Sequence, residues 1–218
     1  MAGVRFHGPI DLHTHSSVSD GTETPAELMR AAAASGLGTI AITDHDSTAG
    51  WDEAARTARE EGITLIPGME FSTRVMHSSV HLLAYLFDPQ HPAFAAERMR
   101  LREERLSRGE RIVAALAADG HPVAWERIVE RSEGGVVGRP HIARALVEAG
   151  VVESVDHAFA TLLHHRSPFY VAKADTDVLD GIALVRAAGG VPVFAHGLAT
   201  RRGRVVGDEA IAAMSEMT

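Results

Sequence analysis

Short apolar segments that end next to a histidine or a glutamate recur along this 218-residue chain. The clearest are residues 39–43 before His45, residues 63–66 before Glu70 and residues 191–195 before His196. Their continuous apolar and β-branched composition is typical of buried parallel strands. Helical patterns lie between the early segments, so strand and helix alternate. We therefore expect an α/β fold in which these side chains meet at the carboxyl ends of parallel strands.

The first helices have clear boundaries in the sequence. Residues 24–27, Thr-Pro-Ala-Glu, place a threonine at the N-cap, a proline at the first helical position and a glutamate at the third, which is a capping-box start. The helix should end at Ser35-Gly36, and a second helix over residues 50–61 should end at Gly62.

The segment Asp11-Leu12-His13-Thr14-His15 carries two imidazoles at alternate positions. In the strand expected over residues 9–13, alternate side chains point to one face, and Asp20 can reach the same point from a nearby turn. Two histidines and a carboxylate are natural ligands of first-row divalent metals. His-x-His also arises by chance in a chain with 13 histidines, so the interpretation depends on ligands from other segments.

His81 differs from the other candidates because it opens its expected strand, residues 80–87, instead of following one. It reaches the common site only if this strand runs antiparallel to its predecessor, with a turn between residues 74 and 79. The candidate ligands are His13, His15, Asp20, His45, Glu70, His81 and His196. This set is too large for one tetrahedral zinc and suits two or three clustered ions, with Glu70 as the bridge.

Between residues 89 and 170 the alternation gives way to helical sequence. The expected helices cover residues 94–116, 124–131, 139–149 and 154–165, and the earlier pattern resumes with a helix after Asp175, a strand over 191–195 and a helix-like stretch over 208–217. All-helical sequence inside an α/β pattern indicates an inserted subdomain. We therefore divide the chain into a first α/β part (1–88), a helical insertion (89–170) and a continued α/β part (171–218).

Arg139, His141 and Lys173 are candidate phosphate contacts. Arg139 and His141 stand at an expected helix start after a glycine-rich turn, which suits an anion, although an ordinary exposed helix start is equally open. Lys173 is the single lysine of the chain and lies where the insertion ends, and it is as readily a surface residue. Asp11 and Asp44, each close to a candidate ligand, either orient imidazoles or serve in turns.

The composition excludes several classes of protein. A hydrophobic fraction of 45% is enough for a core. The net charge of −8, without a basic block, argues against a duplex-DNA surface but allows a small anionic substrate. Without cysteine, neither disulfides nor thiolate metal ligands are available. No apolar run approaches membrane-spanning length, so we expect a cytoplasmic protein without membrane contact.

These motifs, in this order, resemble the polymerase and histidinol phosphatase (PHP) superfamily. The matching segments are residues 11–15 with Asp20-Gly21, residues 42–46, residues 68–72 with 80–83, and Phe194-Ala195-His196. The resemblance extends through residues 87–89 and 138–141 and covers nearly the whole chain.

The resemblance implies a distorted (β/α)7 barrel with an inserted helical subdomain. It also implies a metal-dependent phosphoesterase in which the candidate ligands hold a trinuclear site of manganese, iron or zinc, and a metal-bound hydroxide is the nucleophile. Arg139, His141 and Lys173 would contact phosphate. The insertion is most similar to a branch of nucleoside 3′,5′-bisphosphate phosphatases, with relatives that act on AMP or as 5′-3′ exonucleases on short RNA. A small phosphorylated nucleotide is thus the expected substrate, and short RNA ends are a further expected partner.

One feature departs from the family, which closes its site with an Asp-x-His pair on a final strand. No such pair follows His196. We expect the last part of the barrel to be missing here, with the pair supplied from beyond Thr218; a degenerate member that lacks two ligands is the alternative.

Three other functions stay open on the sequence. They are a histidinol-phosphate phosphatase, a metal amidohydrolase and a non-catalytic PHP-like binding module. Amidohydrolases usually have a bridging lysine after a middle strand, whereas Lys173 lies beyond the insertion. Non-catalytic modules typically lose ligands, whereas the first seven are present here.

Overall fold

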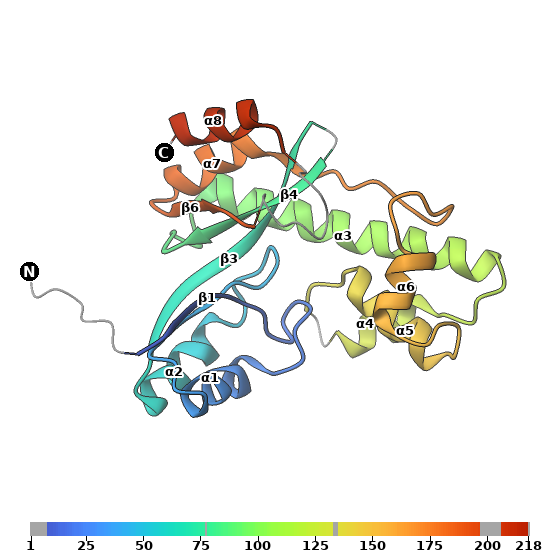
Figure 1. Ribbon diagram of the computed structural model, residues 1–218, viewed down its shortest axis with the longest axis horizontal. Helices are drawn as coiled ribbons and strands as arrows, with labels where there is room; N and C mark the ends of the chain where they lie inside the picture. Colours follow the sequence, from blue (N-terminus) through green and yellow to red (C-terminus); the bar gives the residue numbers. More distant parts are fainter. Residues whose placement is uncertain (1–7, 77, 133–134, 197–205, 218) are drawn as a thin grey trace, which may run out of the picture.

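The computed structural model describes residues 8–76, 78–132, 135–196 and 206–217. Figure 1 shows a mixed sheet flanked by helices, with a helical lobe to one side. In chain order the elements are β1 (Ile10–Thr14), α1 (Pro25–Ala34), β2 (Thr39–Ile42), α2 (Trp51–Glu61), β3 (Thr64–Val75), β4 (Ser78–Tyr85), α3 (Pro92–Ala118), α4 (Trp125–Arg131), α5 (Arg139–Glu148), α6 (Val155–Thr161), β5 (Thr176–Asp177), α7 (Val178–Ala187), β6 (Val191–Phe194) and α8 (Asp208–Glu216).

The sheet joins its strands in the order β1-β2-β3-β4-β6, and β5 pairs with β3. The first three strands are parallel, whereas β4 runs antiparallel to both β3 and β6. The predicted α/β class is therefore confirmed. Among the described strands no pairing joins β1 to β6, so the path of strands is open over this part of the chain.

Strand β3 is much longer than the sequence suggested. The predicted strand covered residues 63–66 and ended before Pro67-Gly68. In the structure the strand continues to Val75, because Pro67 pairs with Ile42 of β2 and Gly68 pairs with Tyr85 of β4. Gly68 is required there, since a Cβ atom would lie 2.8 Å from the Tyr85 ring.

The first helices begin and end where the sequence placed them. The Thr24 hydroxyl accepts a hydrogen bond from the Glu27 backbone amide, and the Glu27 carboxylate accepts one from the Thr24 amide, so the capping box is confirmed. Helix α2 ends at Gly62, which has a φ of 71°. Both helices pack on β2 through an apolar cluster that includes Met29, Ile40 and Ala54.

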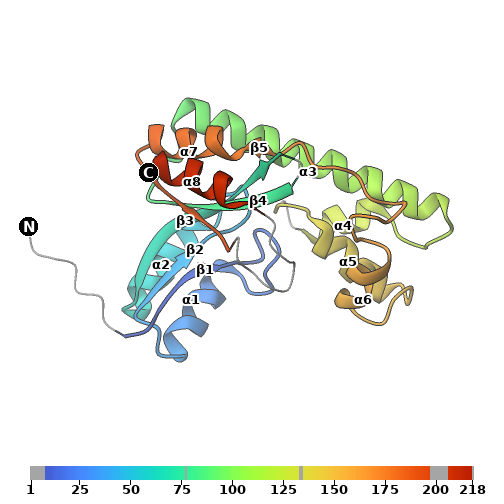
Figure 2. The ribbon, with the colours of Figure 1, turned by 45° about the horizontal axis from the view of Figure 1, so that its top comes forward.

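Helix α3 belongs to two hydrophobic cores. Phe94 and Leu101 in its first half pack with the sheet and α7, whereas Ile112 and Leu116 in its second half pack with α4, α5 and α6. Figure 2 shows the helix extending from above the sheet to the helical lobe. The insertion predicted from residue 89 therefore shares its long helix with the sheet, and we propose that the division falls within α3.

Two smaller differences concern short elements. The two-residue strand β5 had no signal in the sequence, because its pairing with β3 depends on residues far along the chain. Helix α6 ends at Thr161 instead of residue 165. None of the described helices has both the length and the apolar character needed to cross a bilayer.

Gly109 sets how closely α3 and α4 approach. A Cβ atom at Gly109 would lie 2.8 Å from the Trp125 ring. We expect Gly109→Val to destabilise the fold by about 1–3 kcal/mol, because overpacking moves the ring or the helix. The measurement is urea unfolding followed by tryptophan fluorescence. Ala117→Val, at an exposed position of the same helix, is the control and should cost only about 0.6 kcal/mol; equal effects would contradict close packing at Gly109.

Candidate metal centre and anion pocket

The carboxylate of Glu70 lies buried inside a group of five imidazoles. Its side chain is only 3% exposed. Oε2 lies 2.9 Å from His13 Nε2, 2.9 Å from His15 Nε2 and 3.7 Å from His45 Nε2, whereas Oε1 lies 2.6 Å from His81 Nδ1 and 2.9 Å from His196 Nε2. Both carboxylate oxygens therefore face several ring nitrogens at once.

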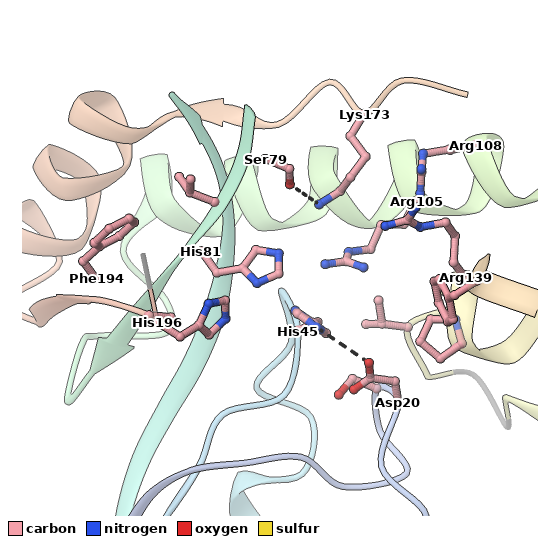
Figure 3. Close-up of a pocket in the computed structure, with 17 residues that line it drawn as sticks. Asp20, His45, Ser79, His81, Arg105, Arg108, Arg139, Lys173, Phe194 and His196 are labelled. Carbon is pink, nitrogen blue, oxygen red and sulfur yellow. Dashed lines mark hydrogen bonds and ion pairs between the residues drawn. The ribbon is translucent and has the colours of Figure 1, made fainter. Parts of the chain in front are cut away.

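The sheet topology brings these side chains together. His13 lies in β1 and His45 follows the parallel β2, so both reach the same end of the sheet. Glu70 lies inside β3 instead of after it, which corrects the prediction, and it forms an isolated bridge with His45. His81 is paired with Ser72 because β4 runs antiparallel, which is the condition that the sequence had left open. Figure 3 shows His81 and His196 side by side, with His45 nearby.

Asp20 completes the cluster from the loop after β1. Its carboxylate oxygens lie 3.5 Å from His15 Nδ1 and 3.8 Å from His45 Nε2. Three overlapping groups have ligand atoms within 4.8 Å of one another: His13, Glu70 and His196; His15, Asp20 and His45; His45, Glu70 and His81. The structure thus places all seven predicted ligand residues around one point.

The charge states of the cluster suit metal binding. Burial raises the pKa of Glu70, but hydrogen bonds from the surrounding imidazoles outweigh it and hold the pKa well below its usual range. Burial lowers the pKa of His45 and of His81, which favours neutral rings. Burial also acts to lower the pKa of His15, but its hydrogen bond to Glu70 and the charge of that carboxylate outweigh burial and raise it. In addition, the buried Nδ1 of His45 has no hydrogen-bond partner. An ionised carboxylate and neutral imidazoles are the forms that bind metals.

Among the residues that the structure describes, neither Asp44 nor Asp11 hydrogen-bonds to an imidazole. Asp44 accepts hydrogen bonds from the Ser16 amide at 2.8 Å, the Ser16 hydroxyl at 2.7 Å and the Ser19 hydroxyl at 2.6 Å, so it fixes the loop that carries Asp20. Asp11 accepts a hydrogen bond from the His13 backbone amide at 3.1 Å. Of the two alternatives for these aspartates, the structure supports the turn role.

A buried ion pair joins α3 to the strands that carry His45 and Glu70. Arg105 Nε donates to Asp46 at 2.6 Å, and Arg105 Nη2 donates to the Ser72 hydroxyl at 2.6 Å. Asp46 also accepts from the Ser72 amide and hydroxyl, each at 2.8 Å. The sequence did not indicate Arg105, because one arginine of a charged helix carries no local mark of its partner.

A cavity of about 210 Å³ lies against the cluster and has four cationic side chains in its wall: Arg105, Arg108, Arg139 and Lys173. The predicted contact Lys173 lies 3.0 Å from Asp175 and 3.3 Å from the Ser79 hydroxyl. Burial, followed by the charge of Arg105, lowers its pKa. Figure 3 shows Lys173 and Arg105 extending toward the histidines, with Arg108 and Arg139 on the far side.

Arg108 is a buried cation that the sequence did not single out. Its Nε donates to the Val171 carbonyl at 2.7 Å, and its guanidinium lies 5.6 Å from the centre of the Tyr170 ring. The residue is 7% exposed, and its Nη2 has no hydrogen-bond partner. Burial and the nearby charge of Arg139 lower its pKa to about 10. Such a group is expensive to bury unless an anion pairs with it.

Arg139 and His141 differ in position although they were predicted together. Arg139 lines the cavity, where its Nη1 donates to the Leu163 carbonyl at 3.0 Å. His141 lines a separate groove instead, and its ring hydrogen-bonds the backbone of Gly138 and of Ser19. The structure therefore does not bring His141 into the cavity with Arg139, and its role as a phosphate contact stays a prediction.

Comparison with known proteins gives a consistent family. The family model described as "PHP domain" matches residues 11–121. A 3′,5′-nucleoside bisphosphate phosphatase from Chromobacterium violaceum is 36% identical over 86% of this chain and 66% of its own length. A 5′-3′ exoribonuclease from Haemophilus influenzae is 37% identical over 86% of this chain and 68% of its own length. The chain thus spans about two thirds of the length of these relatives.

Solved structures share the fold. A protein from Bifidobacterium adolescentis, described as a candidate metal-dependent phosphoesterase, is 38% identical with a TM-score of 0.91, over 97% of this chain and 76% of that one. A Chromobacterium violaceum protein, described as an amidohydrolase with bound sulfate and no metal, is 33% identical with a TM-score of 0.87, over 95% of this chain and 74% of that one.

The Arg105–Asp46 pair should support both stability and the metal centre. We expect Arg105→Ala to cost about 3–5 kcal/mol, because it leaves a buried carboxylate unpaired. The matched control is Arg111→Ala on the same helix, where the exposed pair with Glu104 should contribute less than about 1 kcal/mol. Urea unfolding measures both. Equal losses would contradict the assigned importance of the buried pair.

Proposed function

Because this chain belongs to the PHP-domain family, we propose that it is a metal-dependent phosphomonoesterase that acts on a small nucleotide. One observation carries the proposal: the buried Glu70 and its imidazoles border directly on a cavity walled by cations. The first part of this arrangement suits divalent metals, and the second suits phosphate.

The residues present fit two or three divalent ions. His13, His15, Asp20, His45, Glu70, His81 and His196 would hold them. Glu70 would bridge, because each of its oxygens faces a different set of imidazoles. The mix of carboxylate oxygen and imidazole nitrogen donors is compatible with manganese, iron or zinc. Such ions supply an activated water and neutralise charge on a phosphoryl group.

The chain's own side chains would position the substrate. Lys173 and Arg105 extend into the cavity beside the imidazoles, so they can bind the phosphate that is to be cleaved. Asp46 holds Arg105 in place through an ion pair of 2.6 Å, and Asp175 holds Lys173 through one of 3.0 Å. Fixed donors of this kind act through positioning and charge complementarity.

The far side of the cavity favours a substrate with a second anionic group. Arg108, which has an unpartnered nitrogen, lines that side with Arg139, away from His81 and His196. A nucleoside bisphosphate places one phosphate at the cluster and the other at these arginines. The similarity to a relative named 3′,5′-nucleoside bisphosphate phosphatase supports this choice.

The alternatives are less well supported. Histidinol phosphate has one phosphate and would leave Arg108 without an anion. An amidohydrolase with a bridging lysine is disfavoured because Lys173 Nζ pairs with Asp175 outside the imidazole group. A binding module without activity is disfavoured because all seven ligand residues lie together. Action on the 5′ ends of short RNA stays a second candidate, since several relatives are named 5′-3′ exoribonucleases.

A substrate panel tests the proposal directly. With added manganese, phosphate release should be fastest from adenosine 3′,5′-bisphosphate, compared with AMP, histidinol phosphate and 5′-phosphorylated short RNA. Glu70→Ala is the paired variant, which should lose both bound metal and activity because the shared carboxylate is gone. No phosphate release from any compound by the wild-type chain, with metals bound, would refute the proposal.

Arg108 should discriminate between one and two phosphates. We expect Arg108→Gln to raise the KM for the bisphosphate about 10- to 100-fold, since a charge-assisted hydrogen bond contributes about 1.5–3 kcal/mol. The KM for AMP and the metal content should change little. Arg111→Gln, an exposed arginine of the same helix, is the control. A parallel loss on both substrates would place Arg108 outside the second phosphate site.

A further inference from the structure

We propose that a groove between α4 and α5 binds the phosphates of a single-stranded oligonucleotide whose 5′ end occupies the metal centre. This inference rests on the proposed function and extends it to a longer substrate. The groove has a volume of about 410 Å³. Its charged side chains are Arg127 and Arg131 of α4 and Arg144 and Glu148 of α5, and we call it the arginine groove.

The arginine groove has an excess of positive charge. Arg127 and Arg131 are four residues apart on α4, so both project to the same side of the helix. Arg131 pairs with Glu148, whereas the Arg127 side chain makes no ion pair or hydrogen bond in the part of the chain that the structure describes. This local excess stands out in a chain with a net charge of −8. Exposed arginines in a groove are the usual means of following a phosphate backbone.

The groove adjoins the metal centre across the first turns of α5. Arg139 and Pro140 line the cavity at the cluster, whereas Arg144, further along the same helix, lines the groove. Arg144 Nη2 donates to the backbone carbonyl of Asp20 at 2.7 Å, and the Asp20 carboxylate faces the imidazoles. An α-helix is only about 10–12 Å across, so the two sites lie within the reach of a short strand.

The size of the cavity favours an extended ligand outside it. At about 210 Å³ it is smaller than the roughly 300–1,000 Å³ of sites that enclose a drug-sized ligand. The first nucleotide of an oligonucleotide would fill it, and the following phosphates would lie on the surface. Relatives named 5′-3′ exoribonucleases are 35–37% identical to this chain. A single strand suits the groove, because arginines in a groove can contact the phosphates of one strand without any base pairing.

The test compares strand lengths in the paired variant Arg127→Gln/Arg131→Gln. Binding of 5′-phosphorylated RNA is measured by fluorescence anisotropy without added metal, so that the strand is not cleaved. We expect the variant to bind a hexanucleotide on the order of tenfold more weakly, with a salt dependence lower by about 1.4 in log–log slope, for two lost phosphate contacts. A dinucleotide should bind within about twofold of wild type, because its phosphates stay at the metal centre.

Arg30→Gln/Arg59→Gln is the matched control, since it removes the same charge from α1 and α2. Unchanged hexanucleotide binding in the groove variant, an equal loss in the control, or an equal loss for the dinucleotide would each overturn the inference. Hydrolysis of adenosine 3′,5′-bisphosphate separates the two proposals. If wild type hydrolyses it but the groove variant binds the hexanucleotide as tightly as wild type does, only the groove fails. If no phosphoester is hydrolysed, the proposed function fails, and the anisotropy result still tests the groove.

Discussion

The rest of the site depends on the contacts between the buried carboxylate of Glu70 and the imidazoles around it. A carboxylate that is 3% exposed is costly unless polar partners surround it, and here five imidazoles do so. Those partners come from β1, β4 and the loops that follow β1, β2 and β6, so no single segment can form the cluster. The mixed sheet brings these imidazoles to one place, and a change in the register of its strands would move them apart.

The helical lobe is part of this site and not an addition to it. Arg105 of α3 neutralises Asp46 next to His45, and Arg144 of α5 holds the backbone of Asp20. His141 ties the start of α5 to Ser19 in the same loop. Three contacts from the lobe therefore fix segments that carry ligand residues. In addition, α3 contributes to both hydrophobic cores and so joins the packing of the lobe to that of the sheet.

The sheet and the helical lobe contribute different groups to the site. The strands and the loops that follow them supply the imidazoles and carboxylates of the cluster. The lobe, including the second half of α3, supplies Arg108, Arg139 and the arginine groove. Under the proposed function, changes in the lobe would alter substrate choice while the seven candidate metal ligands stay the same. Relatives named as a phosphatase, exoribonucleases and a phosphodiesterase are consistent with this arrangement.

The sequence by itself determined the features that depend on neighbouring residues. The capping box at Thr24, the strand over residues 39–42 and the alternate imidazoles of His13 and His15 all have local signals. The tertiary structure decided whatever depends on distant partners. It placed Glu70 within a strand, paired Arg105 with Asp46, buried Arg108 and turned His141 toward the backbone. Burial and ion pairing are set by residues far away in the chain, and a single sequence contains no local mark of them.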